Sequence, residues 1–291
     1  MADEREIDPE TQTETTGHEW DGIKELDTPM PRWWLWTLYA TIVWGVIYTI
    51  LMPAWPLINS ATPGLLGYST RADVAAEIDA HRARNAPLDA RLIATPLAAV
   101  ADDPELLRFA VAGGGAVFRN QCSQCHGAGG QGAIGGFPNL LDDDWLWGGS
   151  VDAIHQTVTH GIRDETDAGT RFSLMPAFGD ILSGQEIDAL VQYVGRLSEP
   201  GHDAVTAAGS QGAALFAANC ASCHGEDATG MQADGVPSLA DGIWLYGRSE
   251  DAIRASITGG RGGMMPSFQA RLTPAEIAKV AVYVHSLGGG E

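Results

Sequence analysis

Two short motifs in the sequence place thiols and an imidazole at a spacing that suits covalent attachment of a cofactor. The pattern C-x-x-C-H occupies residues 122–126 and recurs at residues 220–224. Two thiols one helical turn apart can meet the two vinyl groups of a haem, and the next histidine can reach the iron from the same side. The motifs therefore predict two covalently bound haem c groups. The candidate residues are Cys122, Cys125 and His126 in the first motif, and Cys220, Cys223 and His224 in the second.

Other uses of paired cysteines fit the sequence less well. A zinc site would need further Cys or His residues at ligand spacing, and the two motifs already use all four cysteines of the chain. A thioredoxin-like redox pair would need a βαβ setting, which the sequence pattern does not indicate. The sequence therefore favours haem attachment over a zinc site or a redox pair.

Two methionines are candidates for the sixth ligand of iron. A thioether is the usual second axial ligand of a c-type haem because it is soft and favours ferrous iron. Met175 and Met265 are each followed by Pro-x-Phe, and the repeat described below aligns them; Met264 is the nearest competitor. Spacing alone does not assign either methionine to either haem. Pro138 and Pro237 lie where a loop carbonyl would accept a hydrogen bond from the ligating imidazole.

Three further side chains have open roles. Trp145 and Trp244 occupy equivalent positions and would line a haem edge, donate an indole N–H to a propionate, or simply pack in the core. His160 is considered as a spare iron ligand, although the histidines outside the motifs are expected to be ordinary surface or loop residues.

The chain after about residue 104 is an internal duplication. Gly-x-x-x-Phe precedes each C-x-x-C-H motif, and a ten-residue segment at 145–154 recurs at 244–253. The first copy carries about nine extra residues within 161–174. Each copy ends in a predicted helix that begins with a capping box, at Ser183 and Thr273. These patterns predict two all-α haem-binding modules, residues 104–200 and 201–291, with a linker near 198–209.

The segment before the repeats predicts a membrane anchor. Residues 33–52 contain no charged side chain, and twenty helical residues span about 30 Å, the thickness of a bilayer core. We assign residues 33–58 to this anchor, because Pro53 and Pro56 end the helix. Residues 1–32 are expected to be an acidic, mostly disordered tail and not a secretory signal. Residues 59–103 form a connecting segment with short helices, one opening at a capping box at Thr70 and running to about Asn85.

Composition narrows the classes of partner. The 37 acidic and 17 basic residues give a net charge of −20, which argues against nucleic acid and favours a basic partner. The 45% of hydrophobic residues exclude a chain disordered throughout.

Several longer motifs resemble the dihaem subunit, or subunit III, of cbb3-type cytochrome c oxidases. The resemblance rests on residues 22–27 (GIKELD), 31–36 (PRWWLW), 53–56 (PAWP) and 67–69 (GYS), together with the two haem motifs. It implies one N-terminal transmembrane helix followed by two tandem class I cytochrome c domains. It also implies a single-pass subunit of the bacterial inner membrane, with a cytoplasmic N-terminus and periplasmic haem domains. Such a subunit relays electrons from a basic cytochrome c donor, through a monohaem cytochrome c subunit, toward the catalytic haem-copper oxidase subunit.

The same resemblance implies that the methionines are exchanged between the copies. The first iron would take His126 and Met265, and the second would take His224 and Met175.

Iron with both axial positions filled can exchange electrons but cannot bind substrate, so we expect a non-catalytic electron relay. Two alternatives stay open at this point. The first is a free membrane-tethered electron shuttle, and the second is a dihaem peroxidase or thiosulfate-oxidising enzyme with an accessible iron.

Overall fold

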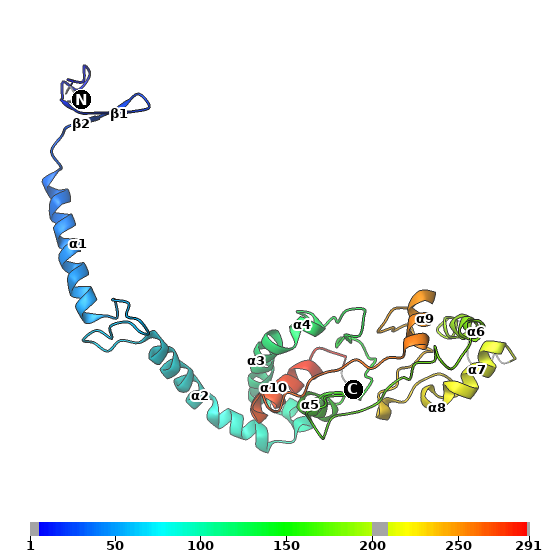
Figure 1. The fold of residues 1–291 in the computed structure, drawn as a ribbon. Coiled ribbons are helices and arrows are strands. Elements are labelled where there is room, and N and C mark those ends of the chain that lie inside the picture. Colours follow the sequence, from blue (N-terminus) through cyan, green and yellow to red (C-terminus); the bar gives the residue numbers. More distant parts are fainter. Residues whose placement is uncertain (1–5, 200–208, 290–291) are drawn as a thin grey trace. The chain divides into compact units, whose positions relative to one another are not determined.

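The computed structural model describes residues 6–199 and 209–289 (Figure 1). The chain divides into two compact units, Met1–Arg82 and Ala83–Glu291. The expected linker at 198–209 falls almost entirely outside the described residues. The fold is mostly helical, as the sequence predicted.

The acidic N-terminal segment contains a β-hairpin, so our expectation of a mostly disordered tail is wrong for residues 15–26. Strand β1 (Thr15–Trp20) pairs antiparallel with β2 (Ile23–Leu26). The turn residues Asp21 and Gly22 both have positive φ, 50° and 84°, which the two-residue hairpin turn requires. The Asp-Gly pair therefore indicates a hairpin turn, although the acidic composition of the segment suggested disorder.

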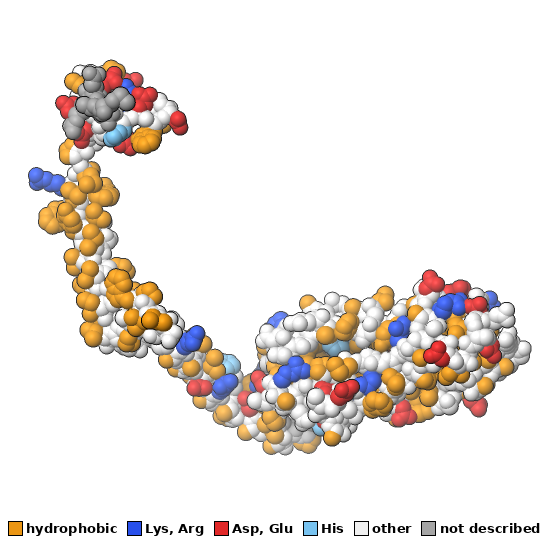
Figure 2. Space-filling view, viewed as in Figure 1, with side chains coloured by type: hydrophobic (Ala, Val, Ile, Leu, Met, Phe, Trp, Pro, Cys, Tyr) orange, Lys and Arg blue, Asp and Glu red, His pale blue; other side chains and the backbone are white. Residues whose placement is uncertain are grey.

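Helix α1 (Arg32–Leu51) coincides with the uncharged run at residues 33–52 to within one residue at each end. None of its residues is buried within the protein, and hydrophobic side chains cover it in Figure 2. The loop after the helix turns back on its last turn, where Leu65 N–H donates to Ile50 O at 3.0 Å and Leu66 N–H donates to Leu51 O at 3.0 Å. Carbonyls at the end of a helix otherwise need water, so these bonds suit an apolar setting.

Helix α2 (Thr70–Ala94) is longer than the short helix that we expected. Ser69 is the residue that caps it, because its Oγ accepts a hydrogen bond from Ala72 N–H at 3.3 Å. Thr70 is therefore not the cap. The helix continues through Pro87 because its last turns are held by tertiary contacts: Leu92 is fully buried, and Asp89 pairs with Lys279 at 2.6 Å.

The remaining helices follow the two sequence copies. The predicted starts at the capping boxes of Ser183 and Thr273 are confirmed, and Asp103 caps the third helix. In the first copy, after the 3₁₀ turn η1 (Leu97–Asp102), they are α3 (Pro104–Gln121), α4 (Ser123–His126), α5 (Val151–His160) and α6 (Gly184–Val194). In the second copy they are α7 (Gln211–Asn219), α8 (Ala221–His224), the 3₁₀ turn η2 (Gln232–Asp234), α9 (Glu250–Gly259) and α10 (Pro274–His285).

The closing helices are exchanged between the copies. Helix α10 of the second copy packs on α3 and α5 of the first, and α6 of the first copy packs on α7 and α9 of the second (Figure 1). We call the group built on α3, α5 and α10 the first core, and the group built on α6, α7 and α9 the second core. The boundaries 104–200 and 201–291 thus mark sequence copies, and each core draws helices from both.

A glycine lies at each exchanged helix crossing. A Cβ on Gly114 of α3 would lie 2.1 Å from Lys279 O of α10, and a Cβ on Gly212 of α7 would lie 2.5 Å from Ala189 O of α6. One turn later an aromatic pair closes each contact, with ring centroids 5.4 Å apart in both cases. The pairs are Phe118 with Tyr283 and Phe216 with Tyr193.

The two cores also contact each other reciprocally. Tyr246 of the second copy lies against Gly136 of the first, 3.1 Å from the position of a Cβ there. Trp147 of the first copy lies still closer to Gly235 of the second, 2.1 Å from the position of a Cβ there, and Gly235 has a φ of +64°. Gly135 N–H donates to Leu245 O at 3.0 Å across the same contact.

We predict that Gly114→Ala destabilises the first core, because the new methyl group would force α3 and α10 apart. Overpacking of this kind costs about 1–3 kcal/mol of unfolding free energy. Thermal unfolding of the detergent-solubilised full chain measures the effect. Gly184→Ala is the matched control, because a Cβ at Gly184 meets nothing within 4 Å. Equal melting temperatures for the two variants would contradict the close helix approach.

Candidate functional site

Each C-x-x-C-H motif forms one helical turn. In the first, Cys125 N–H and His126 N–H both donate to Cys122 O, at 3.1 and 3.0 Å. The second motif has the same bonds at 3.1 and 2.9 Å, within α8. All four cysteines are free thiols, so none is committed to a disulfide. The thiols of each motif therefore lie one turn apart, as attachment to a single planar ring requires.

The histidines are held by the loop that follows each motif. His126 Nδ1 lies 3.1 Å from Pro138 O, and His224 Nδ1 lies 3.0 Å from Pro237 O. A carbonyl can only accept, so Nδ1 carries the proton and Nε2 is left with a lone pair for a metal. Burial lowers the pKa of both histidines and so favours the neutral, ligating form. These contacts confirm the expected role of the two proline carbonyls.

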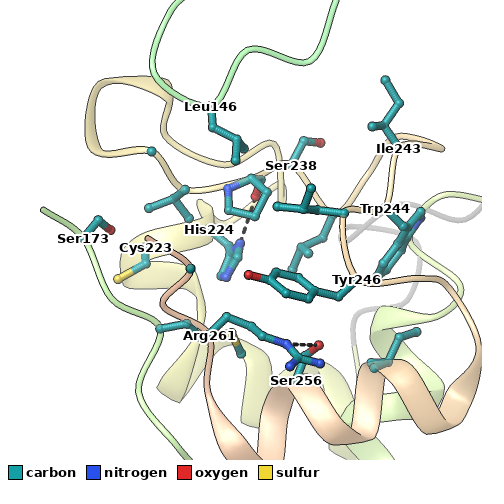
Figure 3. A pocket seen from close by; sticks show the side chains of 18 of the residues that line it. Leu146, Ser173, Cys223, His224, Ser238, Ile243, Trp244, Tyr246, Ser256 and Arg261 are labelled. Atoms are coloured by element: carbon teal, nitrogen blue, oxygen red, sulfur yellow. Dashed lines mark hydrogen bonds between the residues drawn. The ribbon is translucent and has the colours of Figure 1, made fainter. Parts of the chain in front are cut away.

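A cavity of about 500 Å³ adjoins the second motif (Figure 3). Cys223, His224, Tyr246 and Arg261 are among the residues that line it. The Arg261 guanidinium lies 4.2 Å from the centre of the Tyr246 ring, and its Nε donates to Ser256 Oγ at 2.9 Å. The sequence patterns had not marked this aromatic–arginine pair.

The two equivalent tryptophans differ in their hydrogen bonds. Trp145 Nε1–H donates to Gly289 O, which satisfies it within the protein. Trp244 Nε1–H is buried and has no hydrogen-bond partner among the described residues, and its side chain lines the cavity. A buried indole N–H without a partner costs free energy, so its position fits a carboxylate-bearing group in the cavity. The cavity, the free thiol pair and the available Nε2 together fit a haem.

Each methionine packs against the core that holds the motif of the opposite copy. Met265 and Cys122 both pack against the first core, and Met175 and Cys220 both pack against the second. Both are partly buried, whereas Met264 is 65% exposed. The exchange of the closing helices thus carries each Met-Pro-x-Phe loop into the other core.

Both methionines are held by the same backbone pattern. Met265 N–H donates to Ile162 O at 3.0 Å and Ile162 N–H donates to Met265 O at 2.9 Å. Met175 exchanges the equivalent pair of bonds with Arg261, at 3.0 and 3.1 Å. Gly161 precedes the first of these bridges with a φ of +70°, and a Cβ there would lie 2.4 Å from Met265 O.

The extra residues of the first copy form a polar loop that sequence analysis noted only as an insertion. Asp164 and Asp167 are 8% and 7% exposed. The hydrogen bond from Ser267 N–H holds the pKa of Asp164 below its ordinary value. Burial by itself would raise the pKa of Asp167, but hydrogen bonds from Ser267, Gly169 and His160 together hold it below its ordinary value. His160 Nδ1 lies 3.1 Å from Asp167 Oδ1, which accounts for this histidine without iron.

Two carboxylates that follow the first motif also line the cavity. Asp142 and Asp144 line the cavity, and burial together with nearby Asp241 raises the pKa of Asp144 to about 6. This cluster gives the site a negative surface.

Two family models match this chain. Residues 12–59 match the family model described as the N-terminal domain of cytochrome oxidase-cbb3, FixP. Residues 109–194 and 207–284 each match the model described as cytochrome C oxidase, cbb3-type, subunit III. The two separate matches fall on the two sequence copies.

Similar curated proteins extend over nearly the whole chain. The Cbb3-type cytochrome c oxidase subunit CcoP of Cereibacter sphaeroides is 56% identical over 279 residues, 95% of each chain. That of Rhodobacter capsulatus is 53% identical over 292 residues, 96% of this chain and 97% of the relative. The subunit FixP of Azorhizobium caulinodans is 50% identical over 279 residues, 95% of this chain and 94% of the relative. The chain therefore belongs to the cbb3-type cytochrome c oxidase subunit III family, and its cytochrome c domains imply haem c as the cofactor.

Proposed function

We propose that this chain is the membrane-anchored dihaem electron-relay subunit of a cbb3-type cytochrome c oxidase. It would accept electrons from a cytochrome c donor and pass them toward the oxygen-reducing subunit. The observation that carries the proposal is the meeting, in each core, of one C-x-x-C-H motif with one Met-Pro-x-Phe loop. Family membership supports the same assignment.

Two haem c groups fit the two motifs, and we assign their ligands by the packing of the cores. The first haem would be attached at Cys122 and Cys125, with His126 and Met265 on iron. The second would be attached at Cys220 and Cys223, with His224 and Met175 on iron. Met265 packs against the same core as Cys122, and Met175 packs against the same core as Cys220, which supports this exchanged assignment.

The chain's own residues explain why the role is relay and not catalysis. Haem supplies a metal that changes oxidation state by one electron. The proline carbonyls at 138 and 237 orient the histidines, and the two methionine thioethers would be the second ligands of a bound haem. An iron held by both a histidine and a methionine would have no open position for substrate. We therefore infer that the chain is a non-catalytic subunit of an enzyme complex.

The partners and the membrane orientation follow from the same proposal. The monohaem cytochrome c subunit and the catalytic haem-copper subunit would be its neighbours. The net charge of −20 and the cluster around Asp144 suit a basic cytochrome c donor. Covalent haem attachment of this type takes place outside the bacterial cytoplasmic membrane. We therefore place both cores in the periplasm, α1 across the inner membrane, and the N-terminal hairpin in the cytoplasm.

We predict two covalent haems per polypeptide. Denatured full-length protein should retain two haems, measured by the pyridine haemochrome spectrum against the protein concentration. Replacing Cys122 and Cys125 by serine should leave one, because the second motif keeps both thiols. A value of one or zero in the unaltered chain would end the dihaem assignment.

We predict that the methionine variants act on the opposite copy's haem. Met265→Leu should lower the potential of the haem at Cys122 and Cys125 by a sizeable part of the roughly 0.8 V range that axial ligands span. Met175→Leu should act in the same way on the haem at Cys220 and Cys223. Redox titration of the full chain, with the serine variants used to assign each haem, measures both effects. Met264→Leu is the matched control and should change neither potential. An effect of Met265→Leu confined to the second haem would refute the exchange.

We predict that an externally added protease cannot reach the N-terminal hairpin. In spheroplasts, such a protease should cleave exposed loops of the haem cores and spare residues 1–32, because the membrane shields the cytoplasm. Immunoblots against each end of the chain measure this. Removal of the N-terminal segment with the haem cores intact would reverse the orientation.

A further inference from the structure

The two methionine loops have the same backbone pairing but different side-chain support. In the first core, Phe268 N–H donates to Val158 O at 3.2 Å; in the second, Phe178 N–H donates to Ile257 O at 3.0 Å. These bonds, together with the methionine bridges described above, repeat in both cores. Any difference between the loops must therefore come from side chains.

Two aspartates of the first copy's insertion, Asp164 and Asp167, form hydrogen bonds with the Met265 loop, and we call this set of contacts the grip. Asp164 Oδ2 accepts from Ser267 N–H at 2.6 Å. Asp167 Oδ2 accepts from Gln269 Nε2 at 2.6 Å and lies 2.8 Å from Ser267 Oγ. The Ser267 hydroxyl also lies 2.7 Å from Thr159 O, so its one hydrogen is shared between two acceptors. These bonds hold Ser267 and Gln269, which lie two and four residues after Met265.

The insertion is also held in place by hydrogen bonds of its own. Thr166 donates to Asp164 Oδ1 from both its N–H (2.8 Å) and its hydroxyl (2.7 Å). Gly169 N–H donates to Asp167 Oδ1 at 2.8 Å. Arg163 donates from Nη1 to Ser173 O at 2.6 Å and from Nε to Gly263 O, two residues before Met265. Buried carboxylates with several donors each hold one geometry, because any displacement leaves a charge unpaired.

The second core has none of the corresponding groups in its sequence. The residues that align with Ser267 and Gln269 are Ala177 and Gly179, whose side chains cannot form hydrogen bonds. The second copy also has only Arg261, two glycines and Met264 between Gly260 and Met265. Only the first core therefore has both the acidic side chains and the side chains that donate to them.

We propose that Asp164 and Asp167 are positioning residues for Met265. They hold the loop so that the thioether stays on the iron of the haem at Cys122 and Cys125. The first haem then keeps its methionine against competing ligands better than the second, whose Met175 loop depends on backbone bonds. The proposal rests on the exchanged ligand assignment made above.

Imidazole titration of the full-length, oxidised dihaem protein tests the proposal. Imidazole displaces methionine from ferric haem, and the loss of the methionine–iron charge-transfer band reports the displacement. The Met265→Leu and Met175→Leu variants assign the two components of that band. In the unaltered protein the second haem should bind imidazole more tightly than the first. Equal affinities would overturn the proposal.

Two variants weaken the grip and one serves as control. Asp167→Asn keeps the shape of the side chain but removes the charge, and Ser267→Ala removes the hydroxyl and gives the residue found in the other loop. Each should raise imidazole affinity at the first haem about tenfold, the effect of losing one charge-assisted hydrogen bond, and leave the second haem unchanged. Glu165→Gln, an exposed acid in the same insertion, should change neither.

The possible results separate this inference from the ligand assignment. A merely structural role would lower the melting temperature without changing imidazole affinity at the first haem, and this result would overturn the proposal. If Met265→Leu alters the first haem but neither grip variant does, the grip fails and the assignment stands. If Met265→Leu alters only the second haem, the assignment itself fails. Ser267→Ala is the smallest change, so retention of two covalent haems shows that this variant has folded.

Discussion

The close approach of backbone at Gly114 and Gly212 is the constraint on which the rest of the second unit depends. Each glycine lets a closing helix from the other copy lie against the helix before a haem motif. Each methionine comes eight residues before the cap of a closing helix, Met175 before Ser183 and Met265 before Thr273. Once the helices are exchanged, the short connection obliges the methionine to follow. Helix packing thus decides which core each methionine loop packs against.

Features set by neighbouring residues could be predicted from the sequence. The capping boxes, the start of α3 at Asp103, the extent of α1 and the contacts from Pro138 and Pro237 to the histidines all depend on residues close in the chain. The Asp-Gly turn of the hairpin was also local, but the acidic composition around it outweighed that signal. The extension of α2 depends on burial of Leu92, a tertiary contact that the sequence pattern does not show.

The exchange of helices could not be derived from the repeat. Both copies carry the same interface residues, a glycine and phenylalanine on one helix and a tyrosine on the other, so Tyr193 and Tyr283 would fit either partner. A pattern shared by two copies predicts the contact but not which copy provides each side. The same reasoning applies to Trp147 and Tyr246, whose reciprocal packing on glycine appears only in three dimensions. The family resemblance, and not spacing, implied the exchanged methionines.

The exchanged closing helices also bear on the order in which the protein is made. Met265 follows His126 by 139 residues, so the first core stays incomplete until nearly the whole chain has been synthesised. The second core is complete as soon as α7 to α9 have been synthesised, because α6 and Met175 precede them in the chain. Maturation of the first site would therefore end last, although its motif is synthesised first. A chain released early from the ribosome would lack α10 and the Met265 loop, which the second copy contributes to the first core.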